Sequence, residues 1–297
     1  MPELPEVEAL TEALSARTVG HRVARAAVAD LSALKTFDPP LNALVGSAVE
    51  DIGRRGKFLD WTFVTPDGEL LHLVIHMARA GWIRWVESPS PAPPKPGRGP
   101  LALRLIFADA SGEIVGGIDV TEAGTKKSLA VYVVRSLDDV EGVGRLGPEP
   151  LDSSFTPEVF DQILDEAGGK QIKGVLRNQS VIAGIGNAYS DEILHAAKLS
   201  PFAAANKLDA EARAALLGAI RSVLLGATAR AAGSAPETLK SEKKAAMAVH
   251  GRTGQKCPVC GDVVREVSFA DSSLQYCATC QTGGKILADR RMSRLLK

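Results

Sequence analysis

The positions of hydrophobic residues predict a helix at the start of the chain, followed by a β-rich segment. Leu4, Val7, Leu10 and Leu14 recur at helical spacing, while glutamates occupy the other faces. Beyond this helix, short runs rich in β-branched and aromatic residues continue to about residue 137, for example 58–64, 70–75, 101–107 and 129–134. We therefore expect a helix and an antiparallel β-sandwich over residues 1–137.

Glycine and proline mark the breaks between these predicted strands. Turn signals occur at 66–68, 109–112 and 116–117. Residues 88–100 hold six prolines and two glycines, a composition that excludes regular secondary structure. We expect this stretch to be a loop between two strands rather than a domain boundary.

From residue 146 onward the hydrophobic periodicity becomes helical. Shorter helices are predicted over 157–167, 171–178 and 187–197. A longer helix starts at Asp209, which suits the N-cap position. These elements indicate a helical domain over 146–249 and leave a cysteine-bearing module over 250–297. The fold class expected for the whole chain is α+β.

Length and composition indicate a globular protein. The chain has 297 residues, of which 45% are hydrophobic, enough for at least one substantial core. Its first residues carry glutamates where a secretory signal carries basic residues, and no uninterrupted apolar run approaches the roughly 18 residues that cross a bilayer. We therefore expect a cytoplasmic protein, a monomer, that makes no membrane contact.

The formal net charge of zero conceals a gradient along the chain. Residues 240–297 contain 11 of the 35 Lys and Arg but only 5 of the 35 Asp and Glu. A basic C-terminal segment on an acidic body suits a polyanion held at one face. A merely solvated basic tail explains the same charges equally well.

All four cysteines lie in the last module. They form two pairs, Cys257-Pro-Val-Cys260 and Cys277-Ala-Thr-Cys280, separated by sixteen residues. Two such knuckles place four thiolates tetrahedrally around one zinc ion, and four sulfur ligands leave no position for water. We therefore predict one structural zinc ion. The alternative, two disulfides, is disfavoured in a cytosolic chain.

The N-terminus offers a nucleophile. Met1 precedes a small residue, so its removal by methionine aminopeptidase would leave Pro2 with a free secondary amine. An α-amine titrates near pH 8 and is partly neutral at physiological pH. Such an amine can attack C1′ of a damaged nucleoside and form an iminium. The alternative is that Pro2 simply starts a helix well.

Two further residues suit the same chemistry. Glu3, beside the amine, can handle protons if it is partly buried. Lys57 lies at a glycine-flanked turn, Gly53-Arg-Arg-Gly-Lys-Phe58, where it can reach a phosphate. The alternative for Glu3 is a favourable interaction with the positive end of the helix dipole, and the alternative for Lys57 is a solvated position in a loop.

These features occur together in one known family. The sequence Pro2-Glu-Leu-Pro-Glu-Val-Glu8 resembles the N-terminus of the formamidopyrimidine-DNA glycosylase and endonuclease VIII family. In order along the chain, Gly56-Lys57 resembles the lysine turn of that family, and Gly184-Ile-Gly-Asn-Ala-Tyr-Ser-Asp-Glu192 resembles its helix-two-turns-helix element. The two cysteine pairs resemble its zinc finger. The resemblance covers nearly the whole chain.

The resemblance implies an activity and its residues. The protein would be a base-excision repair glycosylase with AP-lyase activity, with Pro2 as the Schiff-base nucleophile, Glu3 as the proton-handling carboxylate and Lys57 as a phosphate contact and acid. Gly186 and Asn187 would hold the DNA phosphates at the start of a helix, where backbone N–H groups favour anions. Lys173 would also approach the DNA backbone. DNA would lie in a cleft between the sandwich and the helical domain.

The sequence also departs from the family pattern where side chains fill the gap left by a flipped nucleotide. Arg79 aligns with a wedge methionine, and Asp119-Val-Thr-Glu-Ala-Gly124 replaces a loop with Arg and Phe. Ser272 replaces the finger arginine that normally enters the DNA. Basic residues available as substitutes are Arg265, Lys285, Arg290 and Arg291.

These departures bear on the substrate and on activity itself. They disfavour duplex 8-oxoguanine and favour an oxidised pyrimidine, an abasic site or a lesion in single-stranded DNA. A second function remains open, a non-catalytic protein on the same fold that binds damaged or structured DNA.

Other signals have structural explanations. The five histidines show no metal-ligand spacing and are expected in the core or on the surface. Trp61, Trp82 and Trp85 lie on strand-like segments and are expected in the core. Residues 240–244 fit either a mobile loop that touches the flipped base or a solvated charge run.

Overall fold

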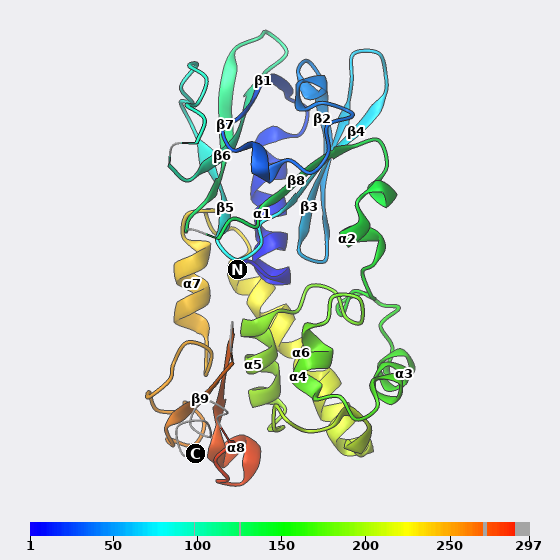
Figure 1. Ribbon diagram of the computed structural model, residues 1–297, viewed down its shortest axis with the longest axis vertical. Helices are drawn as coiled ribbons and strands as arrows, with labels where there is room; N and C mark the ends of the chain where they lie inside the picture. The colour runs from blue at the N-terminus through cyan, green and yellow to red at the C-terminus, as the bar shows by residue number, and fades with distance from the viewer. Residues whose placement is uncertain (98, 125, 270–271, 289–297) are drawn as a thin grey trace. The chain divides into compact units, whose positions relative to one another are not determined.

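The computed structural model describes residues 1–97, 99–124, 126–269 and 272–288 (Figure 1). The chain divides into two compact units. The first comprises Met1–Leu146 with Arg230–Lys240, and the second comprises Gly147–Ala229 with the chain from Ser241 onward. We describe each unit by itself.

The first unit begins with the expected helix, α1 (Leu4–Thr18). Glu3 occupies its N-cap position and donates its backbone N–H to Glu6 Oε2 over 2.9 Å. Val7, Leu10 and Leu14 are completely buried in the core of the unit. The helix therefore forms where the hydrophobic spacing predicted it, with its apolar stripe turned inward.

The rest of this unit is built on one antiparallel sheet of eight strands in the order β5-β7-β6-β1-β2-β3-β4-β8. The strands are β1 (Arg22–Val28), β2 (Ala48–Arg55), β3 (Phe58–Val64), β4 (Leu70–His76), β5 (Gly81–Val86), β6 (Leu101–Ala108), β7 (Ile114–Glu122) and β8 (Ala130–Val134). The short segments η1 (Leu31–Ala33) and η2 (Leu41–Leu44) lie between β1 and β2, and η3 (Leu137–Asp139) and α2 (Glu141–Gly144) follow β8.

The sheet consists of two four-stranded halves. Strands β1 and β2 join the halves through a single residue pair, Arg22 with Ala48. Both halves contribute to one hydrophobic core, which also includes α1 and the completely buried Trp61 and Phe63. This confirms the α+β class and the antiparallel sheet at the N-terminus.

One predicted turn is wrong. Gly116 and Gly117 lie within β7 rather than between strands. A Cβ on Gly116 would lie 2.2 Å from an atom of the Trp85 ring, and a Cβ on Gly117 would lie 2.6 Å from the carbonyl oxygen of Leu105. Glycine is required here by close packing and not by a chain reversal. The proline-rich stretch between β5 and β6 forms no helix or strand in its described residues, as expected.

The second unit contains the expected helices. They are α3 (Pro157–Ala167), α4 (Ile172–Arg177), α5 (Asn187–Ala196) and α6 (Ala210–Ala231), with the short η4 (Ala205–Lys207). Thr156 caps α3 by accepting the N–H of Val159, and Asp209 caps α6 by accepting the N–H of Ala212 over 2.9 Å. The lysine-rich segment is helical, as α7 (Leu239–Ala246), so the loop alternative is wrong, while the exposure of most of its charged residues agrees with a solvated charge run. Leu239 and Lys240, at the start of α7, belong to the first unit.

Helix α6, with 22 residues, is long and apolar enough to cross a membrane by length and composition, and it is the one such helix among the described residues. This finding stands against the expectation that no apolar run reaches such a length, although α6 also contains Arg213 and Arg221. Arg213 binds Asp165, and Arg221 donates to the carbonyl oxygen of Phe155. Because a core helix of a globular unit passes the same test, this finding is weak evidence for a membrane span.

The C-terminal module belongs to the second unit. It contains the antiparallel pair β9 (Val264–Ser268) and β10 (Ser273–Cys277), followed by α8 (Ala278–Thr282).

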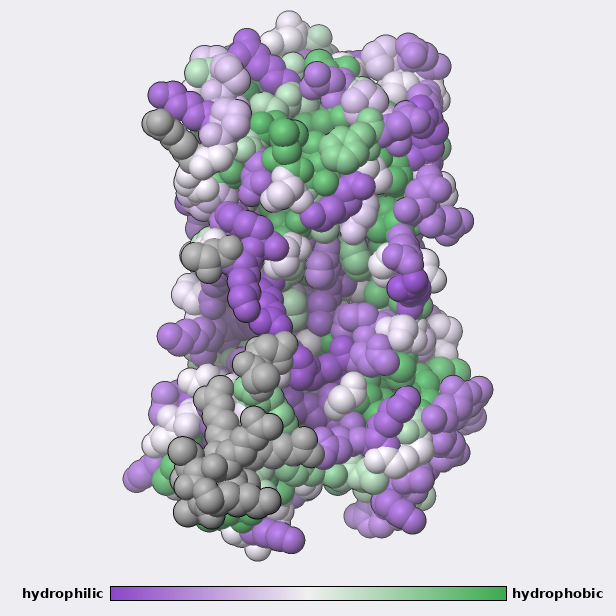
Figure 2. Space-filling view, viewed as in Figure 1, coloured by the Kyte–Doolittle hydropathy of each residue, from purple (hydrophilic) through white to green (hydrophobic). Residues whose placement is uncertain are grey.

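Figure 2 shows that hydrophobic side chains gather on the visible surface of the first unit around β1 and β2. Among the large exposed hydrophobic residues of that unit are Leu31, Phe37 and Val45.

Candidate functional site

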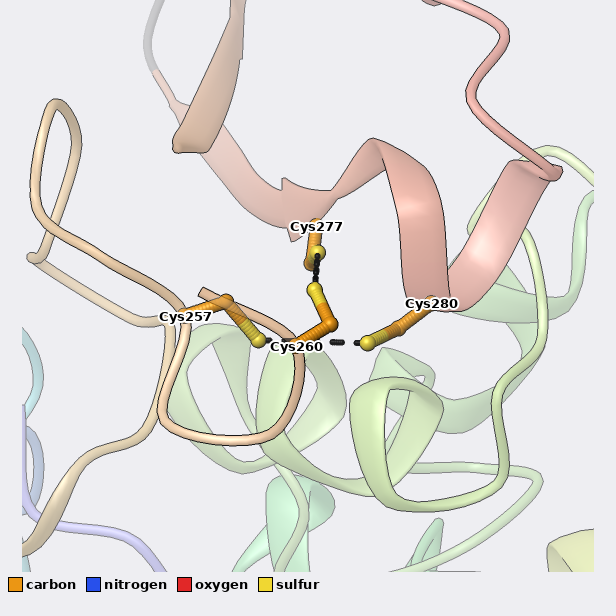
Figure 3. A group of neighbouring side chains, drawn as sticks. All are labelled: Cys257, Cys260, Cys277 and Cys280. Carbon is orange, nitrogen blue, oxygen red and sulfur yellow. Dashed lines mark hydrogen bonds between the residues drawn. The ribbon is translucent and has the colours of Figure 1, made fainter. Parts of the chain in front are cut away.

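The four cysteines form one cluster (Figure 3). Their sulfur atoms all lie within 4.8 Å of one another. The Sγ atoms of Cys257 and Cys280 are 3.9 Å apart, and those of Cys260 and Cys277 are 3.3 Å apart. Four sulfurs at about 2.3 Å from one zinc ion would be about 3.8 Å apart, so the cluster fits a tetrahedral zinc site.

The chemistry of the thiols supports the same conclusion. Burial raises the pKa of the Cys277 thiol to about 11. At neutral pH this thiol therefore needs a bound cation to be present as a thiolate. Free thiols rather than disulfides are present in the structure, so the disulfide alternative finds no support.

Helix α5 connects this cluster to the rest of the second unit. His195 Nε2 lies 3.2 Å from Cys257 Sγ, and the histidine is buried. The carboxylate of Glu192 accepts the backbone N–H groups of Ala248, Val249 and His250. The expectation that His195 is only a core residue is incomplete, because the fold brings it against a zinc ligand distant in sequence.

Lys173, expected to approach DNA, is buried beneath the start of α5. Its Nζ lies 2.6 Å from Asp191 Oδ1, 2.8 Å from Ser190 Oγ and 3.2 Å from the carbonyl oxygen of Asn187. The other oxygen of Asp191 is 2.7 Å from His250 Nδ1. These contacts give Lys173 a structural role at the Asn187 turn, and its DNA contact stays a prediction.

Gly186 and Asn187 lie where the sequence predicted them, at the N-terminus of α5. Gly186 is the N-cap residue and Asn187 begins the helix. The Asn187 side-chain nitrogen donates to the carbonyl oxygen of Ser273 over 2.8 Å, and its Oδ1 is buried without a hydrogen-bond partner among the described residues. The backbone N–H groups of the first helical turn give this end a partial positive charge.

In the first unit, Pro2 and Glu3 are both buried at the start of α1, and Glu3 is only 2% exposed. The chain carries Met1, so the Pro2 nitrogen is part of a peptide bond. Glu3 is buried, which is the condition stated above for a role in proton transfer. The helix dipole alone does not explain a buried carboxylate at this position.

Lys57 is 6% exposed, so the alternative of a solvated loop lysine is wrong. It follows Gly56, whose φ of +55° closes the turn between β2 and β3. Arg54 connects this turn to α1, since its Nε binds Glu8 Oε2 at 2.5 Å and its Nη1 donates to the Gly56 carbonyl oxygen over 3.0 Å. Burial and the charge of Lys57 lower the pKa of His76 to about 4.

Two of the segments that depart from the family pattern have clear local structures. Arg79 is exposed in the turn between β4 and β5, next to Ala78, whose φ is +47°. The segment aligned with the gap-filling loop is instead the end of β7. There Asp119 binds Arg104 through two hydrogen bonds of 2.6 and 2.7 Å, and Glu122 accepts the N–H groups of Ser128 and Leu129.

The finger hairpin carries Ser272 near its tip, where Phe269 N donates to the Ser272 carbonyl oxygen over 2.8 Å. Arg265 pairs with Tyr276 near the base of the hairpin and lies 3.9 Å from Asp262. Lys285 follows α8 and is exposed. Arg290 and Arg291 lie outside the described residues. Thus none of the described candidate substitutes stands at the hairpin tip.

Three family models match the chain. The formamidopyrimidine-DNA glycosylase N-terminal domain matches residues 1–122, and the formamidopyrimidine-DNA glycosylase H2TH domain matches residues 146–238. A zinc finger found in FPG and IleRS matches residues 254–283. Together with the sulfur cluster, this last match shows one structural zinc site.

Individual proteins agree with these models. The formamidopyrimidine-DNA glycosylase of Symbiobacterium thermophilum is 32% identical over 303 residues, covering 98% of this chain and 93% of the relative. An uncharacterized formamidopyrimidine-DNA glycosylase-like protein of Mycobacterium tuberculosis is 59% identical over 152 residues, covering 51% of this chain and 94% of that protein.

Solved structures are similar as well. The Lactococcus lactis Fpg in complex with DNA containing an abasic site matches 94% of this chain and 99% of its own, with a TM-score of 0.79 and 27% identity. The complex of the same enzyme with DNA containing an oxidized pyrimidine matches 95% of this chain and 100% of its own, with a TM-score of 0.79 and 28% identity. The chain therefore belongs to the formamidopyrimidine-DNA glycosylase family.

Proposed function

We propose that this protein is a DNA glycosylase with AP-lyase activity that acts through the amine of Pro2. The observation that carries the proposal is the bridge from Glu8 through Arg54 to Gly56. It holds the first turns of α1 against the turn that bears Lys57, within one compact unit. Two buried ionisable groups, Glu3 and Lys57, therefore belong to the part of the fold that carries Pro2. The protein would work as a monomer in the bacterial cytosol.

The chemistry requires removal of Met1. The freed secondary amine attacks C1′ of the damaged nucleoside, forming a C–N bond as the damaged base leaves with the electrons of the glycosidic bond. Glu3 handles the protons of this step. Cleavage of the C1′–O4′ bond, with transfer of a proton to O4′, then opens the sugar and converts the resulting aminal into an iminium. The iminium accepts the electrons of the C2′–H bond when that proton is removed, and those electrons expel the 3′-phosphate. Lys57 would contact the phosphate and supply acid to this elimination.

The start of α5 would hold DNA phosphates. Gly186 and Asn187 lie at the positive end of the helix dipole, a position that favours anions. The buried ion pair between Lys173 and Asp191 fixes the carbonyl oxygen of Asn187. Lys173 would thus support the phosphate contact by holding the turn in place.

The lesion is proposed to be something other than 8-oxoguanine in duplex DNA. The segment that aligns with the gap-filling loop of the family carries neither its Arg nor its Phe, and up to Glu122 it is a paired strand in which Asp119 binds Arg104. We expect a preference for an oxidised pyrimidine, an abasic site or a lesion in single-stranded DNA. Excision of these lesions depends less on the gap-filling Arg and Phe and on the finger arginine, which this chain lacks at the aligned positions. A panel of oligonucleotides with these lesions measures the preference, and efficient excision of 8-oxoguanine opposite cytosine would contradict it.

Borohydride trapping on DNA with an abasic site tests the nucleophile. Only an amine that forms a Schiff base gives a covalent adduct, so the processed protein should be trapped. Pro2→Gly, or an N-terminal extension that blocks the amine, should abolish trapping. Pro5→Ala is the matched control, because Pro5 is a second buried proline at the start of the same helix. Trapping that persists with a blocked amine would make a lysine the nucleophile.

The second candidate function is a non-catalytic protein that binds damaged or structured DNA. It is favoured by the absence of a cation at the described part of the hairpin tip, where Ser272 stands. This alternative predicts salt-dependent DNA binding by a processed protein that is never trapped. Retention of buried Glu3 and Lys57 favours the enzyme.

A further inference from the structure

A lysine is held over a tryptophan on the first unit. Lys240 Nζ lies 4.5 Å from the centroid of the Trp82 ring. Trp82 in turn donates its indole N–H to the carbonyl oxygen of Pro236 over 2.9 Å. Leu239, the neighbour of Lys240, is 1% exposed and belongs to the core of the unit. The Lys240 amine is therefore positioned by the Trp82 ring, by the burial of Leu239 and by the hydrogen bond that joins Trp82 to Pro236.

A second cation lies near this lysine without a compensating acid. Trp82 and Arg84 are two residues apart on β5, so Arg84 projects to the same side of the strand as the ring over which Lys240 lies. Burial and the charge of Arg84 lower the pKa of Lys240. Among the residues that the structure describes, neither Lys240 nor Arg84 forms an ion pair. Like charges that lie close together raise the local positive potential, which favours binding of an anion there.

Further cations continue on the same face of the sheet. Arg84 on β5 stands opposite Asp119 on β7, which stands opposite Arg104 on β6. Residues directly opposite in antiparallel strands project to the same side. Asp119 is engaged by Arg104 through two hydrogen bonds, so the charge of Arg84 remains uncompensated. Because neighbouring strands are about 4.8 Å apart, the Cα atoms of Arg84 and Arg104, two strands apart, are separated by about 10 Å.

The row leads to a groove. A cavity of about 520 Å³ is lined by Arg104, by Arg25 and by prolines of the loop between β5 and β6. Arg25 also donates to the carbonyl oxygen of Pro91 over 2.6 Å, which fixes that loop. Arg84, Arg104 and Arg25 thus lie on three of four neighbouring strands, β5, β6 and β1, a length that suits a polymer of phosphates better than a single small anion.

We propose that Lys240 and Arg84 form an anion site that binds the phosphodiester backbone of a nucleic acid on the sheet face of the first unit. The inference rests on the proposed function, because it assigns two further backbone contacts to the same DNA ligand. It goes beyond that function by assigning these contacts to β5 and to the start of α7, in addition to Lys57 and Asn187. The Trp82 ring positions Lys240 and need not touch a base.

Salt titration of DNA binding tests this site. The full processed chain and the variants Arg84→Gln and Lys240→Gln bind a labelled duplex with an abasic site between about 50 and 300 mM KCl, read by fluorescence anisotropy. Each lost phosphate contact should lower the slope of log affinity against log salt by about 0.9. Arg84→Lys and Lys240→Arg should restore most of the slope, since they keep the charge.

The matched control is Arg135→Gln. Arg135 is an exposed cation of the same unit that is already paired with Glu69 and Asp38, and it follows β8, the strand at the other edge of the sheet. Melting temperatures equal to the wild type establish that each variant is folded. If Arg84→Gln and Lys240→Gln keep the wild-type slope, as Arg135→Gln should, the proposed site is wrong.

The outcome separates this inference from the proposed function. Wild-type trapping together with unchanged slopes in both variants would reject only the anion site. A wild-type protein that shows no salt-dependent binding to DNA would reject both. Reduced slopes in the two variants, but not in the control, support the site whether or not trapping occurs.

Discussion

His195 Nε2 lies 3.2 Å from Cys257 Sγ, so the helix that begins at Asn187 reaches a zinc ligand near its other end. A ring N–H that donates to a thiolate stabilises its negative charge and orients the ligand. Through this contact the predicted phosphate-binding turn and the zinc site share one rigid element. Glu192, on the same helix, holds the chain that enters the zinc module.

Replacing His195 should therefore weaken zinc binding. His195→Ala removes a partner of the ligand Cys257 and should lower zinc affinity about 10-fold to 100-fold. Competition with a chromogenic chelator measures the affinity. His21→Ala, in the other unit, is the control and should leave zinc affinity unchanged. Equal affinities for the two variants would show that the contact does not support the metal.

Removal of zinc should unfold the C-terminal module and spare the sheet. The buried apolar side chains of the module form two small clusters, one of Cys257, Val264 and Cys277 with Val249, and one of Val267, Leu274, Tyr276 and Ala278. Clusters of this size bury too little apolar surface to replace metal binding as a source of stability. Hydrogen exchange after treatment with a strong chelator should show loss of protection in β9 and β10. The strands of the first unit should keep their protection, and re-addition of zinc should reverse the change.

Breaking the buried pair of Lys173 and Asp191 should destabilise the second unit. Both side chains are nearly inaccessible to solvent, so removal of one charge deprives the other buried charge of its partner at 2.6 Å. Lys173→Met or Asp191→Asn should each cost about 3 to 5 kcal/mol of unfolding free energy. Urea unfolding measures this loss. Arg145→Met, which breaks an exposed pair with Glu141, is the control and should cost less than about 1 kcal/mol.

His76 should make the first unit less stable in acid. Burial and Lys57 lower its pKa to about 4, whereas an unfolded histidine titrates near 6.5. Between these values the unfolded chain binds a proton that the folded chain does not, so stability falls as the pH drops from about 6.5 towards 4. The difference should reach about 3 kcal/mol at most.

Urea unfolding at about pH 7 and about pH 4.5 measures this dependence. His76→Gln is the comparison, because it removes the imidazole while the cysteines and carboxylates titrate in both proteins. Burial raises the pKa of Asp60, which acts in the opposite direction and is also common to both proteins. An unchanged pH dependence in His76→Gln would contradict the assignment.

Most helices could be predicted from the sequence because their determinants are local. Asp209 caps α6 and Thr156 caps α3, and each accepts from a backbone N–H three residues further along the chain. The zinc ligands could be predicted equally well, because the spacing of the four cysteines is typical of two zinc-binding knuckles. Periodicity and spacing therefore sufficed where the physical cause lies within a few residues.

The remaining features depend on contacts between distant residues. Gly116 resembles a turn residue in sequence, but the Trp85 ring occupies the space that a side chain would need. His195 and Cys257 are far apart in sequence, so no spacing rule relates them. The bridge of Arg54 with Glu8 and the burial of Lys57 follow from the packing of α1 on the sheet, which local pattern does not report.

The first unit is completed by residues from much later in the chain. Ala231 and Leu239 belong to its hydrophobic core, and Pro236 accepts the indole N–H of Trp82. During synthesis the sheet must therefore wait for Gly147–Ala229 to emerge before its core can close. Such long-range contacts raise contact order and slow folding. A fragment ending at Leu146 should accordingly be prone to aggregation, even though it contains every strand of the sheet.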